Sequence, residues 1–369
     1  MKQFRHIFAI LILTALFGCV KTEYMEVPDQ EILFSVGNYA PATKVAALNE
    51  VASVYAFNSK AYLYAEGYMD ASQDFFGAAG ETISARNASG NIVTSGSVSQ
   101  WAPSHPYYWP KSSNSYINFV SWYDKNGTPS ISETSFSISN RTIVADDEIL
   151  LADVAWRYSA NNDPGTYYTT GVPTMFRHLL SRVIVNLRAS LTADPDNASN
   201  TYEVTLQSAS LTGVYNTGSL SLSNSDLMSC GTRAWSSNGN SSLLWTPDTT
   251  SPASISLVSS NTTLGTTATN ILAERSFMPQ ELEDGAILNI TYTVTARSNG
   301  VVTNSECDIP ATLVLNTIDN TAGFAITQWL PGKRYTYNIS INPVSREILL
   351  NPTLESDWTY GPDWSATVE

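Results

Sequence analysis

The stretch Tyr335-Thr336-Tyr337-Asn338-Ile339-Ser340-Ile341-Asn342 alternates strictly between large apolar and small polar side chains. Because successive side chains of a β-strand point to opposite faces of a sheet, this period of two predicts a half-buried strand. Similar alternation occurs at residues 32–36, 183–188 and 288–294. Turn-forming Asn-Gly and Pro-Gly pairs separate many of these runs. The pattern predicts an all-β protein of short antiparallel strands arranged in sandwiches or barrels.

Three other stretches depart from this simple alternation. Residues 116–123 are apolar on both faces and predict a central strand that is covered on each side. Residues 176–183 have apolar side chains at the i, i+3, i+4 and i+7 positions of one or two helical turns. Residues 71–78 predict a second short helical piece. Neither helical segment is long enough to change the all-β assignment.

The chain is long enough to hold two hydrophobic cores. A polar, turn-rich stretch at 159–170 precedes Gly171-Val172-Pro173, after which a new set of alternating runs begins. We therefore expect a domain boundary at this point. The N-terminal β-sandwich domain would span residues 45–172 and the C-terminal β-sandwich domain residues 173–369.

The composition excludes several classes of protein. Of 369 residues, 14% are charged and 11% are aromatic, and the net charge is -14. Low charge together with many aromatic residues argues against intrinsic disorder. An acidic chain lacks the clustered Lys and Arg that bind phosphate groups. We therefore expect no nucleic-acid partner and no electrostatic attachment to anionic membranes.

The N-terminus has the features of an export signal. Lys2 and Arg5 precede an apolar run at 7–17, which is about half the length of a membrane-spanning helix. The run ends in Leu16-Phe17-Gly18-Cys19, which resembles a bacterial lipobox. The sequence thus predicts a signal peptide at 1–18 and a lipid anchor of the palmitate type on Cys19, through which alone the protein contacts the membrane. The alternative is ordinary secretion with a chance cysteine.

Few residues suggest chemistry. His105 and His178 remain after signal removal, and neither lies in a catalytic or metal-binding motif. Asp146-Asp147-Glu148 has the carboxylates to chelate a cation, but three acids in a row more often form a solvated corner. Cys230 and Cys307 can form a disulfide in an oxidising compartment or stay as two separate thiols. We expect no catalytic residue, no cofactor and no metal, hence no enzyme; a secreted hydrolase has no positive support.

Several short motifs follow one another along the chain. They are the lipobox at Cys19, the short strand at 31–39, Thr43-Lys44-Val45-Ala46, Tyr108-Trp109-Pro110, the acidic-Leu-Leu-Ala-Asp stretch at 148–153, Phe176-Arg177-His178-Leu179-Leu180, Met278-Pro279-Gln280, the aromatic-rich stretch at 329–337, and Asp357-Trp358. Their order resembles that of the fimbrillin-like proteins of Bacteroidales, the building blocks of surface fimbriae. The resemblance covers almost the whole chain that follows the signal peptide.

The resemblance implies two tandem transthyretin-like antiparallel β-sandwich domains behind a lipoprotein signal peptide, exported to the outer membrane and cell surface. It also implies that a trypsin-like surface protease removes the first strand and that a strand of a neighbouring subunit fills the groove. On this sequence, residues 19–44 would be a lipidated leader with the removable strand, and Lys44 the leading processing site. Ile32, Phe34 and Val36 would be the displaced plug.

The alternative for this segment is a permanent first strand, with Lys44 as a solvated loop residue. Lys60, the next basic residue, is a poorer cleavage site because it lies inside a predicted strand. If the subunit itself donates a strand, residues 345–354 are the best candidate.

These implications favour a structural subunit of a cell-surface fimbrium that supports adhesion. Its partners would be other fimbrial subunits, a trypsin-like protease and a host or bacterial surface ligand. A tip or minor subunit is favoured because no long extra strand follows Asp357-Trp358. The main alternative is a glycan-binding outer-membrane surface lipoprotein with tandem immunoglobulin-like domains, which exposed, coplanar Trp or Tyr side chains would favour.

Overall fold

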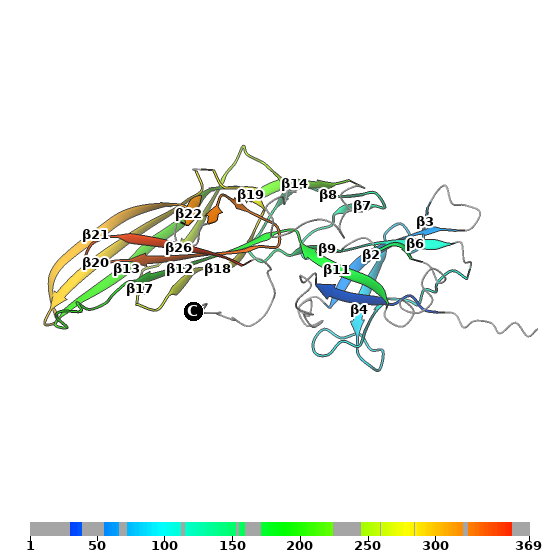
Figure 1. The fold of residues 1–369 in the computed structure, drawn as a ribbon, viewed down its shortest axis with the longest axis horizontal. Helices are drawn as coiled ribbons and strands as arrows, with labels where there is room; N and C mark the ends of the chain where they lie inside the picture. The colour runs from blue at the N-terminus through cyan, green and yellow to red at the C-terminus, as the bar shows by residue number, and fades with distance from the viewer. Residues whose placement is uncertain are drawn as a thin grey trace, which may run out of the picture.

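The computed structural model describes residues 30–38, 55–65, 72–111, 115–152, 155–158, 171–223, 245–258, 260–283, 285–319 and 324–355. These residues form β-strands joined by turns, and none of them lies in a helix. The molecule is elongated, with the N-terminal strands at one end and the C-terminal strands at the other (Figure 1).

The first half of the chain builds a sheet that closes on itself. The strand order is β6 (Tyr116–Asp124), β9 (Ile149–Ala152), β11 (Val172–His178), β1 (Phe34–Asn38), β5 (Gln100–Pro103), β4 (Glu81–Arg86) and β2 (Ala56–Tyr64), and β2 pairs again with β6. We call this closed circuit the ring. Two short strands extend it, β3 (Gln73–Asp74) beside β2 and β10 (Ala155–Tyr158) beside β6. Closure leaves the circuit without an open edge.

Strand β6 is covered on both faces, as the sequence predicts. Ile117 and Phe119 face the core inside the ring, whereas Val120 and Trp122 belong to a second core outside it. Because side chains alternate along a strand, one apolar run can serve two cores only if both of its faces are covered. Trp122 is buried, and so is Trp109 of the Tyr108-Trp109-Pro110 motif.

A second sheet joins the two halves of the chain. Its order is β15 (Trp245–Pro247), β14 (Thr217–Leu222), β8 (Ser135–Thr142) and β7 (Ser130–Ser132). We call it the bridging sheet, because β7 and β8 precede the ring strand β11 in the chain while β14 and β15 follow it. Apolar side chains of β8 and β14 share one core with the outer face of β6 and β9. This shared core ties the ring to the later strands.

The last part of the chain forms a two-sheet sandwich. One sheet has the order β18 (Thr269–Phe277), β12 (Ser181–Ala189), β25 (Arg334–Ile341) and β26 (Ile348–Glu355). The other has the order β16 (Ala253–Val258), β13 (Asn200–Val214), β20 (Ile287–Ser298) and β21 (Val301–Val314), and β17 (Thr262–Leu264) also pairs with β13. Two small ribbons complete it, β19 (Gln280–Glu281) with β24 (Gln328–Trp329) and β22 (Thr317–Asp319) with β23 (Phe324–Ile326).

The aromatic-rich stretch at 329–337 forms a hydrogen-bonded unit in the sandwich core. The Trp329 indole N–H donates to the Tyr337 hydroxyl at 3.0 Å, and the Leu330 amide donates to the Tyr335 hydroxyl at 2.8 Å. Both tyrosines are buried, as the alternation predicts. A buried polar group needs a partner, and these two contacts give each tyrosine hydroxyl a hydrogen bond across the turn that joins β24 to β25.

The two predicted helical pieces are wrong. Residues 176–183 lie in β11, a short connection and β12. Phe176 packs in the ring core, Leu179 and Leu180 in the core under the bridging sheet, and Val183 in the sandwich core. The helix-like spacing arises because the chain passes three cores in succession. The described part of 71–78 contains β3 and a turn through Gly77, whose φ of 80° suits glycine.

Strand pairing adds two features to the sequence expectation. β11 begins at Val172 and pairs with β1 and β9, so the chain stays in the ring as far as His178. Most neighbouring strands are antiparallel, but β1 pairs with β11 in parallel, and so does β12 with β25. Since the bridging sheet mixes strands of both halves, the division into two tandem domains stays a prediction.

Candidate functional site

The candidate site is the place that β1 occupies in the ring. Phe34 to Asn38 pair in parallel with Val172 to Phe176 of β11. On the opposite side, Phe34 pairs with Trp101 of β5. Figure 1 shows β1 in dark blue alongside the green β11. β1 therefore lies between two strands that come from distant parts of the sequence.

The residues just before β1 are also held by backbone hydrogen bonds. The Ile32 amide donates to the Tyr107 carbonyl at 2.7 Å, and the Trp109 amide donates to the Gln30 carbonyl at 2.9 Å. The Val172 amide donates to the Leu33 carbonyl at 2.7 Å. The paired segment thus begins at residue 30 and is longer than β1 itself.

The three predicted plug side chains point into the ring core. Ile32, Phe34 and Val36 are 0%, 3% and 2% exposed, while Leu33 and Ser35 between them are partly exposed. Burial of each such side chain contributes about 1.5–3 kcal/mol before the entropy of ordering is subtracted. Their burial follows from the alternation in the sequence; their displacement stays a prediction.

Phe34 is the centre of an aromatic cluster. Its ring centroid lies 5.7 Å from that of Phe57, 5.5 Å from that of Phe119 and 6.4 Å from that of Phe76. The Phe57 and Phe119 contacts are edge-to-face, a favourable arrangement of aromatic quadrupoles. Phe57 lies on β2, Phe119 on β6 and Phe76 in the turn after β3, so none of the three belongs to the leader.

Gly171 lets the backbones of β1 and β11 approach closely. Its φ is 83°, and a Cβ atom at this position would lie 2.7 Å from the carbonyl carbon of Phe34 and 2.9 Å from the Leu33 oxygen. No other residue type fits both the conformation and the space. The sequence identified Gly171 only as part of a domain boundary, because its role depends on a strand far away in the chain.

Removal of β1 would open the ring. β11 and β5 would become edge strands with unpaired N–H and C=O groups, and the apolar pockets of three side chains would face solvent. We call this space, bounded by β11 and β5 and floored by the aromatic cluster, the slot. Lys44 and Cys19 lie outside the described residues. Lys60 lies inside β2, and its ammonium group donates to the Ile131 carbonyl at 3.0 Å.

The acidic run at 146–148 is not the solvated corner that its sequence predicts. Asp147 and Glu148 are buried, and Asp146 alone is exposed, where Lys125 binds it at 2.6 Å. That ion pair holds the pKa of the Asp146 carboxyl below its usual value. Asp147 accepts hydrogen bonds from Arg141 at 2.9 Å and from the Val144 amide at 2.9 Å.

Glu148 connects the ring to the sandwich. Its Oε1 lies 2.9 Å from His178 Nδ1, and its Oε2 accepts from Arg182 of β12 at 3.1 Å. Arg182 and Arg334 both face Glu274 at 3.9 and 3.5 Å. His178 is therefore a structural residue at this junction. His105 is exposed and lies 3.4 Å from the Glu81 carboxylate.

The cysteines form no functional site among the described residues. Cys307 is exposed on β21, with its Sγ 3.8 Å from the Ser305 hydroxyl. Cys230 lies outside the described residues, so the disulfide stays a prediction. Within those residues, no group of three or more His, Cys, Asp or Glu side chains could hold a metal ion. They also contain no helix long and apolar enough to cross a bilayer.

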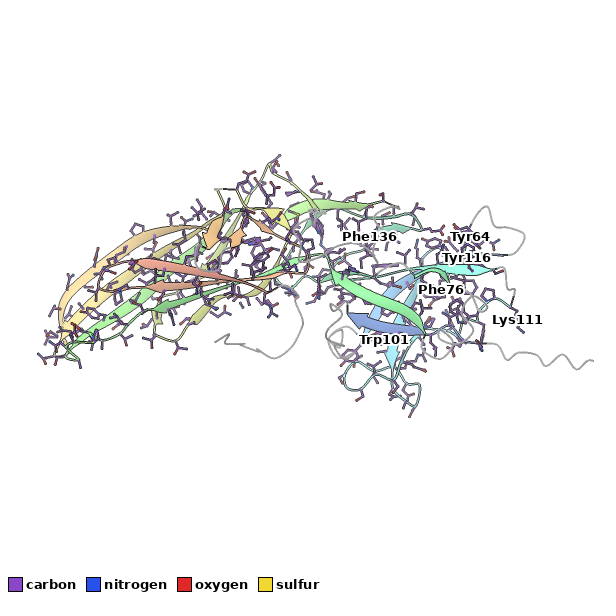
Figure 2. The ribbon with its side chains drawn as sticks, viewed as in Figure 1. Tyr64, Phe76, Trp101, Lys111, Tyr116 and Phe136 are labelled. Carbon is purple, nitrogen blue, oxygen red and sulfur yellow. The ribbon has the colours of Figure 1, made fainter. Side chains whose placement is uncertain are left out.

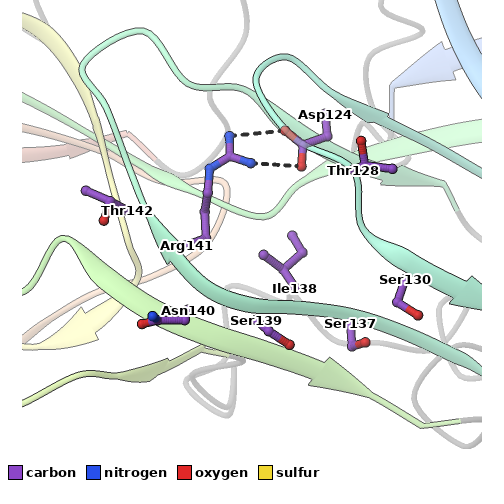
Figure 3. Close-up of a pocket in the computed structure, with 9 residues that line it drawn as sticks. All are labelled: Asp124, Thr128, Ser130, Ser137, Ile138, Ser139, Asn140, Arg141 and Thr142. Atoms are coloured by element: carbon purple, nitrogen blue, oxygen red, sulfur yellow. Dashed lines mark hydrogen bonds and ion pairs between the residues drawn. The ribbon is translucent and has the colours of Figure 1, made fainter.

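A polar hollow of about 320 Å³ lies beside β8 (Figure 3). Hydroxyl and amide side chains line most of it: Thr128, Ser130, Ser137, Ser139, Asn140 and Thr142. The Arg141 guanidinium at its edge donates to both carboxylate oxygens of Asp124, at 3.2 and 3.3 Å, and also to Asp147. Because two carboxylates already neutralise this arginine, the hollow offers little attraction to an anion.

Comparison with solved structures places the fold. A fimbrial protein from Bacteroides vulgatus superposes with a TM-score of 0.52 at 12% identity, covering 89% of this chain and 99% of that one. A candidate cell adhesion protein from Bacteroides uniformis covers 88% of this chain and 97% of its own at 13% identity, with a TM-score of 0.47. Another from Bacteroides ovatus covers 90% and 99% at 15% identity, with a TM-score of 0.41. No curated protein matches the chain significantly in sequence.

The closed ring, the bridging sheet and the terminal sandwich define an all-β protein with the fold of a fimbrial protein. The model of the fimbrillin-like family matches residues 68–358, and the chain belongs to this family. Membership confirms the resemblance seen in the sequence and indicates a structural protein of the cell surface rather than an enzyme.

Proposed function

We propose that the protein is a subunit of a cell-surface fimbrium that is activated by loss of its first strand. Cleavage after Lys44 separates the segment that contains β1, and a strand from a neighbouring subunit then enters the slot between β11 and β5. The protein supports adhesion as part of the resulting fibre. It reaches the surface as a lipoprotein anchored through Cys19.

The observation that supports this proposal is the place of β1 in the ring. β1 is at the same time the first described strand, next to the predicted cleavage site, and the strand that completes the core. A strand entering the slot would gain main-chain hydrogen bonds from two neighbours and pockets for alternate side chains, which is the physical basis of β-augmentation. Lys60 is a poor competing site because it is held within β2.

The proposed donor segment at 345–354 also has a suitable position. It includes most of β26, which among the described strands pairs with β25 alone and forms the edge of its sheet. An edge strand can leave by breaking one ladder of hydrogen bonds, whereas a central strand must break two. That the protein is a tip or minor subunit of the fibre stays a prediction.

Limited trypsin digestion of the purified protein tests the proposal. We expect a new N-terminus at Val45 together with ladders of polymers, and neither product from a Lys44→Gln variant. Cleavage at Val45 that leaves only monomers would contradict strand exchange between copies of this chain. Retention of the intact N-terminus would contradict Lys44 as the processing site. Cys19→Ser should abolish palmitate labelling and outer-membrane attachment.

The glycan-binding alternative gains no support from the tryptophans whose burial is described, although Tyr108 is 45% exposed. Trp101, Trp109, Trp122, Trp245 and Trp329 are all buried. The rings of Tyr64 and Tyr116 stack with their centroids 4.6 Å apart (Figure 2). These two residues are cross-strand neighbours of β2 and β6, so each ring packs against the other. A sugar platform needs an exposed ring face, which the buried tryptophans do not provide.

A further inference from the structure

Within the slot, the position of Phe34 is surrounded by aromatic side chains. The aromatic rings of Phe57, Phe76 and Phe119 surround this side chain and are themselves 1–4% exposed. All three belong to segments that follow the predicted cleavage site. They would therefore remain in place, as an aromatic pocket, when β1 is gone.

The backbone fixes the same point independently. Gly171 lies against the Leu33 and Phe34 backbone, and Phe34 pairs with Val172 on one side and with Trp101 on the other. A strand that slips by one residue would turn its apolar side chains away from the core. A strand that slips by two would place a different side chain in the aromatic pocket. The aromatic pocket and Gly171 therefore both fix the register of the strand at the position of Phe34.

We propose that the slot selects its incoming strand by an aromatic side chain in the Phe34 position, with aliphatic side chains two residues before and after it. The partner is a strand with the pattern aliphatic-x-aromatic-x-aliphatic, as in Ile32-Leu33-Phe34-Ser35-Val36 of the strand it replaces. This inference rests on the proposed strand exchange and adds the chemistry of the partner.

The chain's own edge strand does not have this pattern. On the face of β26 that packs against the sandwich, the side chains are those of Ile348, Leu350 and Pro352. None of them is aromatic, and Pro352 lacks the N–H that a strand with two neighbours would use. β26 of a second copy is therefore a poorer match for the slot than a strand that has this pattern.

Peptide exchange into the trypsin-cleaved full chain tests this selectivity. Cleaved protein that still holds β1 is incubated with fluorescent peptides in mild denaturant, and binding is followed by anisotropy. The probes are the peptide of residues 30–38, the same peptide with Phe34→Leu or with Ser35→Ala, and the peptide of residues 346–355. Ser35→Ala is the matched control, because Ser35 lies on the other face of the strand.

We expect the Phe34→Leu peptide to bind at least about tenfold more weakly than the unmodified one, since loss of ring atoms leaves a cavity in the pocket. The Ser35→Ala peptide should bind within about twofold, and the peptide of residues 346–355 should be as weak as Phe34→Leu or weaker. Equal binding of all four peptides would overturn the selectivity and leave strand exchange intact. If even the unmodified peptide fails to enter, both the selectivity and the proposed function are wrong.

Discussion

Gly171 is the residue at which the leader and the rest of the ring meet most closely. Replacing it with Ala forces an L side chain into a φ of 83° and places a Cβ 2.7 Å from the Phe34 backbone. The conformational strain costs about 1–2 kcal/mol, and the clash with β1 adds about 1–3 kcal/mol. We expect Gly171→Ala to lower the free energy of unfolding by the sum and to speed the tryptic release of the leader.

Gly77 is the matched control for this substitution. Its φ is 80°, but a Cβ there would meet nothing within 4 Å. Gly77→Ala should therefore show the conformational cost alone and leave the rate of leader release unchanged. Equal effects of the two substitutions, measured by denaturant unfolding and by the rate of cleavage, would mean that Gly171 does not seat β1.

Side-chain burial was predictable where it depends on local alternation. Ile32, Phe34 and Val36 face the core because a strand repeats every two residues. The burial of Asp147 and Glu148 was not predictable, because their partners come from residues such as Arg141 and Arg182. Three consecutive acids are expected in solvent unless positive side chains from other parts of the fold pack around them.

At the scale of elements, the Glu133 carboxylate fastens the turn of the β7–β8 hairpin to the ring. Glu133 in its turn accepts hydrogen bonds from the Tyr64 hydroxyl at 3.0 Å, the Ser72 hydroxyl at 2.7 Å and the Asn118 amide at 2.8 Å. Glu133→Ala should cost about 1.5–3 kcal/mol, the usual contribution of hydrogen bonds to a charged group. Amide hydrogen exchange should become faster in β7 and β8 and stay unchanged in the sandwich.

Glu203→Ala is the control for the Glu133→Ala variant. Glu203 is exposed on β13 and forms only a loose pair with Arg297 at 3.7 Å. Its removal should change stability by less than about 0.5 kcal/mol. Unchanged exchange in the Glu133→Ala hairpin would show that the Glu133 hydrogen bonds do not hold the hairpin to the ring.

Strand pairing was less predictable than strand existence. The alternation in 335–341 identified β25, but nothing local indicates that its neighbour β12 runs parallel to it. The same holds for β1 and β11, which are separated by most of the ring. The slot itself could be proposed from the family resemblance, whereas its two walls and the role of Gly171 required the structure, because they depend on contacts between distant segments.

At the scale of the whole molecule, Glu148 joins the ring to the sandwich. It lies just before β9, and His178 and Arg182 bind it at 2.9 and 3.1 Å. Removing one member of a buried ionic cluster typically costs about 3–5 kcal/mol, because the opposite charge stays buried. We expect this loss in Glu148→Ala from denaturant unfolding. The neighbouring Asp146→Ala should hardly change stability, since its pair with Lys125 is in solvent.

The alkaline limit of stability depends on the tyrosines of the sandwich core. Burial raises the pKa values of Tyr335 and Tyr337 well above their usual value. Below about pH 10 both groups are protonated in the folded and unfolded states, so stability does not depend on them. Above that pH the unfolded chain loses these protons while the folded chain keeps them. The free energy of unfolding should therefore fall by about 1.4 kcal/mol per pH unit for each tyrosine. Denaturant unfolding between about pH 8 and about pH 11 measures this slope. Tyr337→Phe should lower stability at neutral pH, because the Trp329 indole loses its acceptor, yet reduce the alkaline slope by one tyrosine's share. An unchanged slope in this variant would show that Tyr337 ionises without unfolding the core.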